Sequence, residues 1–240
     1  MKTQTKVYLG EGCVKEYLSN ILSSYGDTVM LCYGGGSIKK NGIYDEIISV
    51  LKKENKTVVE FSGIPSNPTY SKVLEGVKLA KESNADLILA VGGGSVMDCC
   101  KAISLGAKYD GDIWADFWAR PGVIDFEPLP LGIIVTVSGT GSECNGGAVI
   151  TNEELKIKTG RDYPQLNAKF VMLDPTYTYS VPKFQMVSGA FGYSFAHYGN
   201  LFQRAEREQC IGRYIRGSYE KCYHKFACRY QKSRGLHSKK

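Results

Sequence analysis

Long hydrophobic runs are missing from this sequence. Although 43% of its 240 residues are hydrophobic, apolar stretches such as residues 87–91 and 129–137 are much shorter than the roughly 20 residues that cross a bilayer. The start, MKTQ, is polar after its Met and does not resemble a signal peptide. We therefore expect no transmembrane helix and no export, and we expect a cytoplasmic protein.

Metal-binding spacings are missing as well. None of the eight Cys stands in a zinc-binding spacing, and without export these residues are expected to be reduced thiols. His197, His224 and His237 are the three histidines, and they form no i, i+4 pair of the kind that binds metal on a helix. A metal site built on these residues is therefore disfavoured.

The charge is unevenly distributed along the chain. The net charge is +6, but residues 1–191 carry 19 Lys and Arg against 21 Asp and Glu, whereas residues 192–240 carry 11 against 3. The second segment also has only four Leu and Ile residues and no Val or Met, which is too little apolar surface to offset the entropy of ordering. We predict that two differently built segments meet near Phe191 and that the second is poorly packed.

Strand-like and helix-like patterns alternate over the first segment, which is typical of an α/β domain with a largely parallel sheet. Strands are expected at residues 28–33, 57–61, 87–91 and 129–136. Helices are expected where apolar residues recur at helical spacing, at residues 44–51, 73–79 and 97–105. The fully apolar run at 87–91 predicts a strand that is buried on both faces.

Two of these strands end in the same turn, GGGS, at residues 34–37 and 92–95. Such a turn between a buried strand and a helix lets backbone N–H groups approach a phosphate closely. Neither turn matches the GxGxxG fingerprint or the Walker A motif, and a tight chain reversal alone also favours glycine. Two such turns nevertheless indicate a dinucleotide, bound by a different α/β family.

Three further features each admit two interpretations. Asp98 lies three residues after Ser95, where it can cap the helix or contact a ligand. Residues 136–143 offer hydroxyls at a strand end, where open α/β sheets bind ligands, or form a plain loop. The aromatic residues Trp114, Phe117 and Trp118 are interpreted as a packed cluster rather than as a substrate site.

Taken in order, residues 92–103 (GGGSVMDCCKAI), 136–143 (TVSGTGSE) and 173–175 (LDP) resemble the iron-containing alcohol dehydrogenases. Residues 33–40 (YGGGSIKK) resemble the butanol dehydrogenase branch of that family. The resemblance implies a dehydroquinate-synthase-like, Rossmann-type α/β domain at residues 1–184. It also implies that most of the family's helical C-terminal domain is missing, with residues 185–240 comprising a remnant of its start and a basic tail. Relatives often form homodimers through the N-terminal domain, although no residue pattern here requires one.

The resemblance further implies a set of residues that bind NAD(P). The pyrophosphate would be held by Gly93, Gly94 and Ser95, with Asp98 nearby. The rest of the groove would be lined by Thr136, Thr140, Asn145, Lys158 and Tyr177. The adenosine ribose would be surrounded by Gly35, Ser37 and Asn67.

The choice between the two coenzymes depends on the first turn. Relatives that prefer NAD tend to carry an acidic residue near the position of Ser37, where its charge would repel a 2′-phosphate. Here the position offers a hydroxyl, and Lys39 and Lys40 follow closely. The sequence therefore favours NADP over NAD.

In the family, hydride passes between NAD(P)H and an alcohol or aldehyde whose oxygen is polarised by iron or zinc. The metal is held by one Asp and three His, and the first two of these follow a Gly-Ala-Phe like that at residues 189–191. Gly192 and Ala196 stand at those two positions here, and the other two would lie beyond residue 240. The resemblance thus predicts an oxidoreductase by descent, of the butanol dehydrogenase type, that lacks metal ligands and catalytic residues. The alternative is a nucleotide-binding remnant without catalysis.

The family pattern stops at Phe191, where composition and charge also change. With wobble bases chosen freely, the codons of residues 192–240 read one base further on spell a string that begins DILSH and continues as an acidic, helix-forming segment. We therefore predict a one-base frameshift, which the nucleotide sequence of the gene tests. Nucleic-acid binding by the basic tail is the weaker interpretation, because a random reading frame also yields such a composition.

Overall fold

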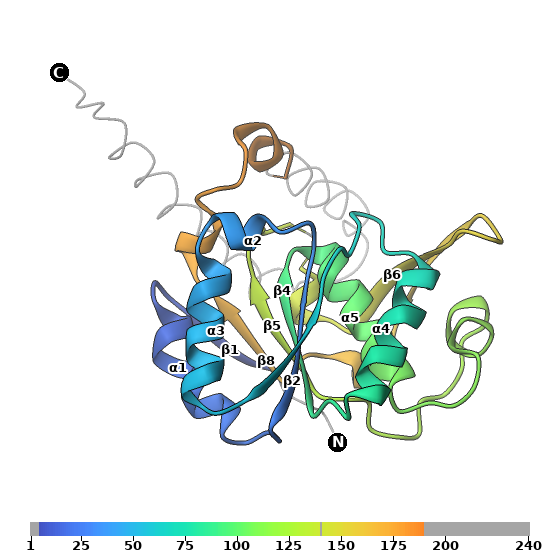
Figure 1. The fold of residues 1–240 in the computed structure, drawn as a ribbon. Helices are drawn as coiled ribbons and strands as arrows, with labels where there is room; N and C mark the ends of the chain where they lie inside the picture. Colours follow the sequence, from blue (N-terminus) through green and yellow to red (C-terminus); the bar gives the residue numbers. More distant parts are fainter. Residues whose placement is uncertain (1–4, 140, 190–240) are drawn as a thin grey trace, which may run out of the picture. The chain divides into compact units, whose positions relative to one another are not determined.

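The computed structural model describes residues 5–139 and 141–189 (Figure 1). Thr140, the three histidines, Gly192, Ala196 and the segment assigned to a frameshift all lie outside the described residues. The predictions that concern them, including the poorly packed tail, stay predictions.

Six strands form the main sheet, and they are β1 (Lys6–Leu9), β2 (Thr28–Tyr33), β3 (Thr57–Phe61), β4 (Leu87–Gly92), β5 (Leu131–Val135) and β8 (Phe170–Leu173). A separate hairpin is formed by β6 (Gly147–Asn152) and β7 (Ile157–Asp162). The α-helices are α1 (Cys13–Leu22), α2 (Ser37–Lys40), α3 (Ile43–Lys53), α4 (Tyr70–Glu82) and α5 (Gly94–Gly106). Shorter helical segments are η1 (Trp114–Ala119), η2 (Ser142–Cys144), η3 (Pro164–Leu166) and η4 (Pro175–Thr178).

The main sheet is parallel throughout and has the strand order β1-β8-β5-β4-β2-β3. The chain passes from β2 outwards to β3 and then crosses back to β4 on the other side of β2, so the strand order reverses between β2 and β4. Tyr33 pairs with Val91, which brings the ends of these two strands to the same level. Open α/β sheets bind ligands at such a reversal, beyond the carboxyl ends of the strands.

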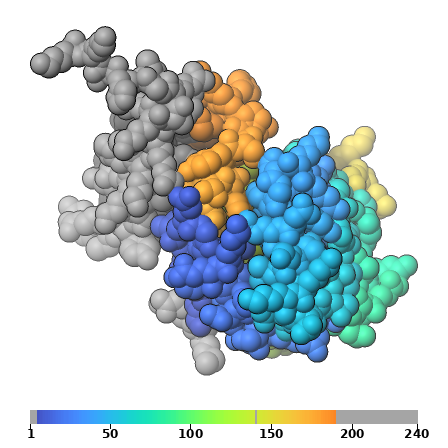
Figure 2. All heavy atoms as spheres, turned by 60° about the vertical axis from the view of Figure 1, so that its left-hand side comes forward, coloured from blue at the N-terminus to red at the C-terminus, as the bar shows by residue number. Residues whose placement is uncertain are grey.

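Helices cover both faces of the sheet, with α1, α2 and α3 on one face and α4 and α5 on the other (Figure 1). Side chains of β4 alternate between the two layers: Leu87 and Leu89 pack with the first group, and Ile88 and Ala90 with the second. Figure 2 views the molecule from the side on which the first group lies at the surface, in blue and cyan. Burial on both faces explains why the central strands are continuous apolar runs.

The strands and helices predicted from hydrophobic patterns are confirmed at their expected places, as is the parallel sheet. The sequence patterns did not indicate β1, β8 or the β6–β7 hairpin. Strand β1 has only four residues, three of them exposed, and β7 is largely exposed and polar, so neither shows a clear apolar alternation. The predicted aromatic cluster is also confirmed, because Trp114, Phe117 and Trp118 are buried in the core.

Within residues 5–139 and 141–189, no helix combines the length and the apolar character that crossing a membrane requires.

Candidate functional site

The second glycine-rich turn joins β4 to the start of α5. Gly93 precedes the helix in an extended conformation and no side chain caps the helix, which leaves the first N–H groups of α5 without partners inside the helix. A Cβ atom at Gly92 would lie 2.6 Å from Cγ2 of Val96, so the close packing of strand on helix requires glycine there. The turn therefore directs backbone donors and the positive end of the helix dipole beyond the sheet edge.

The first glycine-rich turn lies beside it, at the end of β2. Gly36 has a φ of +92°, in the left-handed region that favours glycine. A Cβ atom at Gly35 would meet nothing within 4 Å, and Ser37 is exposed at the start of α2. The two turns are thus neighbours at the reversal between β2 and β4, with open space in front of Gly35.

A carboxylate on β3 accepts hydrogen bonds from the polar side chains next to this first turn. Glu60 of β3 accepts hydrogen bonds from the hydroxyl of Tyr33 at 2.6 Å, from the hydroxyl of Tyr44 and from Nζ of Lys39 at 3.2 Å. The hydrogen bond from Tyr33 is the main cause that lowers the pKa of Glu60. Lys39 also lies over the ring of Tyr44, at 4.4 Å from its centroid. The ammonium group of Lys39 is therefore already paired with the carboxylate of Glu60.

The loop between β3 and α4 reaches the start of α5. The hydroxyl of Ser95 donates to the carbonyl of Ser66, and the next residue, Asn67, accepts a hydrogen bond of 2.7 Å from Nζ of Lys158 on β7. Both Asn67 and Lys158 are exposed. The structure thus brings three of the predicted site residues together from separate segments.

The strand β5 and the loop after it complete the same edge. The N–H group of Thr136 donates to the carbonyl of Gly92 at 3.1 Å, which ties the end of β5 to the second turn. Asn145 is exposed at the end of the loop, and its amide oxygen accepts from the N–H group of Gly147 at 2.8 Å. Thr136 and Val137 therefore lie against the second glycine-rich turn, and a ligand contact by residues 136–143 stays a prediction.

Asp98 does not cap α5, contrary to one of the two interpretations of its position. It lies in the second turn of the helix, and its carboxylate accepts hydrogen bonds from the hydroxyl of Ser142 at 2.7 Å and from the N–H group of Val149 at 3.0 Å. The helix instead begins at a glycine without a side-chain cap. Asp98 thus fixes the segment 142–149 to α5, and a direct contact with a ligand stays a prediction.

Lys101 is the residue at this edge that the sequence patterns did not indicate. Its side chain is fully buried, and Nζ donates to the carbonyl of Ser142 at 2.6 Å, to the Ser142 hydroxyl at 2.8 Å and to the carbonyl of Gly147 at 2.7 Å. Burial lowers its pKa from 10.5 to about 8. The available signal was a charged residue three positions after Asp98, between two cysteines and Ala102-Ile103.

Tyr177 is placed differently from the other predicted residues. It is buried in the layer that contains α3, and its hydroxyl donates to Glu46 at 2.7 Å. Burial is the main cause that raises its pKa. Together with Asn41 and Ser180 it lines a depression between the start of α3 and the residues after β8, where blue and orange segments meet in Figure 2. Its predicted contact with a coenzyme stays a prediction.

The motif at residues 173–175 has a structural role. Asp174 is buried, and its carboxylate accepts hydrogen bonds from the N–H group of Gly12 at 2.7 Å and from the N–H group and hydroxyl of Thr176 at 2.9 and 2.7 Å. It therefore joins the start of α1 to the segment after β8, on the side of the molecule opposite α5.

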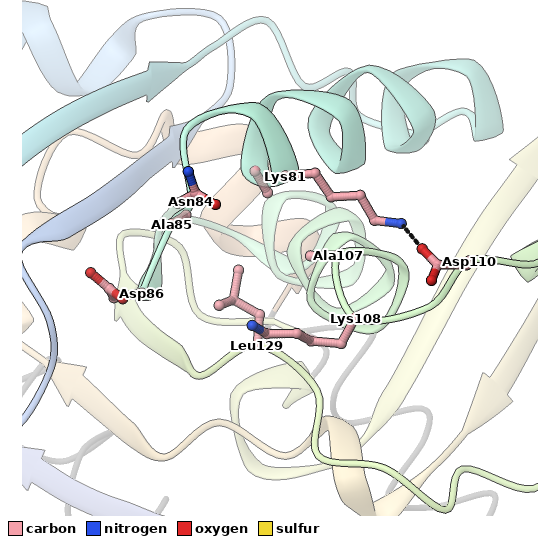
Figure 3. A pocket seen from close by; sticks show the side chains of 9 residues that line it. Lys81, Asn84, Ala85, Asp86, Ala107, Lys108, Asp110 and Leu129 are labelled. Atoms are coloured by element: carbon pink, nitrogen blue, oxygen red, sulfur yellow. Dashed lines mark hydrogen bonds and ion pairs between the residues drawn. The ribbon is translucent and has the colours of Figure 1, made fainter.

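A cavity of about 470 Å³ lies near the amino ends of the strands β4 and β5, at the end of the sheet opposite the glycine-rich turns (Figure 3). It is lined by residues that precede β4 and β5, including Asp86 and Leu129, and by the ends of α4 and α5. Lys81 and Asp110 form an ion pair of 2.8 Å at its rim. Neither glycine-rich turn contributes to this cavity, so it is separate from the candidate site.

Among residues 5–139 and 141–189, no group of three or more His, Cys, Asp and Glu side chains is arranged to hold a metal ion. The sequence positions that the resemblance assigns to the first two metal ligands are Gly192 and Ala196, whose side chains offer no donor atom. The residues present at these positions do not fit the family's metal.

Comparison with known proteins identifies the family. The family model "Iron-containing alcohol dehydrogenase" matches residues 4–175. This chain belongs to that family. It is 47% identical over 203 residues to the probable NADH-dependent butanol dehydrogenase 1 of Bacillus subtilis, a match that covers 82% of this chain and 52% of that protein. It is 36% identical over 200 residues to the NADPH-dependent aldehyde reductase YqhD of Escherichia coli, covering 82% of this chain and 50% of the reductase.

Solved structures of the family share the fold. The crystal structure of NADH-dependent butanol dehydrogenase A from Thermotoga maritima matches with a TM-score of 0.72 and 43% identity, over 78% of this chain and 46% of the other. The predicted α/β fold and the likeness to butanol dehydrogenases are confirmed by these relatives. The chain spans about half the length of the relatives that it matches.

Proposed function

We propose that this iron-containing alcohol dehydrogenase domain binds NAD(P)H along the carboxyl edge of its main sheet. The observation that carries the proposal is the juxtaposition of the two GGGS turns at the reversal between β2 and β4. One turn presents the first N–H groups of α5, and the other leaves open space in front of Gly35. A dinucleotide has two ends joined by a pyrophosphate, and two adjacent turns of this kind suit it.

We assign these residues to successive parts of the coenzyme. Gly93, Gly94 and Ser95 would hold the pyrophosphate, because backbone donors and the helix dipole favour its negative charge there. Gly35, Ser37 and Asn67 would surround the adenosine ribose. The remainder of the groove would be lined by Thr136, Thr140, Asn145, Lys158 and Tyr177. Asp98 would lie near the coenzyme and hold the adjoining loop through its hydrogen bond with Ser142. When bound, the coenzyme supplies or accepts hydride.

We further propose a preference for NADPH over NADH. No carboxylate stands at Ser37, and Lys39 lies two residues further along the same short helix. Its ion pair with Glu60 opposes that preference, because a 2′-phosphate must compete with the carboxylate for it. The preference is therefore expected to be modest, and neutralising Glu60 should increase it.

The activity of the whole protein is proposed to be hydride transfer between NAD(P)H and a short-chain alcohol or aldehyde. The 240-residue polypeptide itself is proposed to be catalytically inactive, because Gly192 and Ala196 replace the side chains that would hold the metal. We propose that residues 1–184 form the nucleotide-binding domain, that residues 185–240 add no catalytic group, and that the protein is a cytoplasmic homodimer.

Coenzyme titration tests the binding proposal. The full chain is titrated with NADPH and with NADH, and the change in nicotinamide fluorescence gives each Kd. We expect both to bind, NADPH more tightly. The variant Ser37→Asp introduces a carboxylate at an exposed helix start, and it should weaken NADPH binding about tenfold or more while changing NADH binding little. Ser24→Asp, the same change at an exposed serine after α1, is the matched control. Failure of both coenzymes to bind would falsify the proposal.

Two further measurements address its finer parts. Glu60→Gln should improve NADPH affinity severalfold without improving NADH affinity, because it releases Lys39 for the 2′-phosphate. For activity, the purified chain is assayed with NADPH, butyraldehyde and added iron or zinc. Reduction no faster than without protein is expected, whereas robust metal-dependent turnover would refute inactivity and leave the binding proposal intact.

A further inference from the structure

A buried ammonium group lies directly behind the candidate coenzyme site. Lys101 has an exposed fraction of 0%, which is rare for lysine unless its charge is paired. It extends from α5 towards the loop 141–147, which connects the edge residue Thr136 to β6. A charge in this position costs free energy of solvation, so its retention calls for a compensating role.

The contacts of Lys101 are concentrated on one short segment. Its Nζ donates to two backbone carbonyls, those of Ser142 and Gly147, and to the Ser142 hydroxyl. It also reaches Oδ1 of Asn145 at 3.3 Å, while the amide nitrogen of Asn145 donates to the carbonyl of Gly141 at 3.2 Å. Four acceptors from one loop therefore converge on a single ammonium, which is a stronger anchor than neutral hydrogen bonds provide.

Asp98 holds the same loop from a second point on α5. Its carboxylate accepts the Ser142 hydroxyl and the N–H group of Val149, so Ser142 lies between Asp98 and Lys101. The ionisable groups that act on Lys101 are Asp98 on its own helix, Glu143 and Cys144 on η2, and Asp162 on β7. The negative charges of the three carboxylates favour the protonated form of Lys101, as would a Cys144 thiolate, and burial opposes it.

We propose that Lys101 is a positioning residue for the coenzyme site, whose buried ammonium fixes the loop 141–147 so that Asn145 is held against the bound coenzyme. This inference rests on the proposed NAD(P)H site. Deprotonation removes one of the three donors of the ammonium and the charge that attracts the loop carbonyls. The coenzyme, which carries a negative pyrophosphate, should therefore bind more tightly to the protonated form.

The test measures Kd for NADH at pH values from 7 to 9.5. NADH is the probe because it lacks the ionisable 2′-phosphate. We expect the affinity of the unmodified chain to fall about tenfold over this range, which corresponds to a rise of about one unit in the pKa of Lys101 when the coenzyme binds. The fall should begin near pH 8, since the free protein loses the Lys101 proton there.

The variant Lys101→Met retains the length of the side chain and removes its charge. It should bind NADH about tenfold more weakly at pH 7, with an affinity that no longer changes between pH 7 and 9.5. Lys81→Met, at the far edge of the sheet, should behave like the unmodified chain. Because Lys101→Met can fail to fold, Ser142→Ala is tested as well. That variant removes one acceptor of Lys101 and should weaken NADH binding about threefold.

The outcomes separate this inference from the proposed function. A pH-independent Kd in the unmodified chain, or equal affinities of a folded Lys101→Met variant and the unmodified chain at pH 7, overturns the role of Lys101 and leaves coenzyme binding intact. Absence of binding of both NADH and NADPH to the unmodified chain overturns both. Circular dichroism of each variant shows whether it is folded, and if Lys101→Met is not, the pH profile of the unmodified chain and Ser142→Ala decide.

Discussion

The buried Lys101 predicts an unusual pH dependence of stability. Its pKa falls from 10.5 in the unfolded chain to about 8 in the folded protein. Between these values the unfolded chain binds more protons, so the contribution of Lys101 to the free energy of unfolding rises with pH. At about 1.36 kcal/mol per pKa unit, the full rise is about 3.4 kcal/mol, of which about 1.3 kcal/mol falls between pH 7 and 9.

Buried cysteines oppose this effect at higher pH. Burial raises the pKa of Cys13 from 9.0 to about 11 and also raises the pKa values of Cys99 and Cys100. A raised thiol pKa contributes stability that is present below pH 9.0 and is lost as the pH rises above it, because the unfolded thiols ionise first. The effect of Lys101 is therefore measured as a difference between two chains that share these cysteines.

The measurement is urea unfolding of the unmodified chain and of Lys101→Met at pH 7, 8 and 9, in the presence of a reducing agent. The difference between their free energies of unfolding should change by about 1.3 kcal/mol in favour of the unmodified chain from pH 7 to pH 9. Lys81→Met is the control and should give a constant difference. A constant difference for Lys101→Met as well would refute the reasoning that Lys101 is buried as an ammonium.

Two further predictions concern packing on the face of the sheet that contains α1. A Cβ atom at Gly132 would lie 2.1 Å from the ring of Phe170, so Gly132→Ala should lower the free energy of unfolding by about 1–3 kcal/mol, and adding Phe170→Leu should recover part of the loss in urea titrations. Asp174→Ala leaves the N–H group of Gly12 without its acceptor and should lower the free energy of unfolding by about 1–3 kcal/mol. Thr176→Val keeps the contact between Asp174 and Gly12 and should lower it less. A larger loss for Thr176→Val than for Asp174→Ala would contradict the structural role of Asp174.

The coarse fold was predictable because its signals are local. Strands such as β4 are buried on both faces and so appear as unbroken apolar runs, and both β2 and β4 are followed by glycine where the chain must turn closely. The exposed edge strand β1 and the hairpin β6–β7 lack such a signal. The pairing of β1 with β8 joins residues far apart in the chain, whereas β6 and β7 pair with each other across a short connection.

The candidate site likewise has features that the sequence shows and features that only the structure shows. The two GGGS turns, the family motifs and the substitutions Gly192 and Ala196 can be recognised in the sequence alone, because each depends on consecutive or regularly spaced residues. The meeting of Asn67 with Lys158 and the enclosure of Lys101 by the loop 141–147 were decided by tertiary structure. Burial and the direction of a side chain depend on which distant segments pack against it, and no spacing along the chain specifies that.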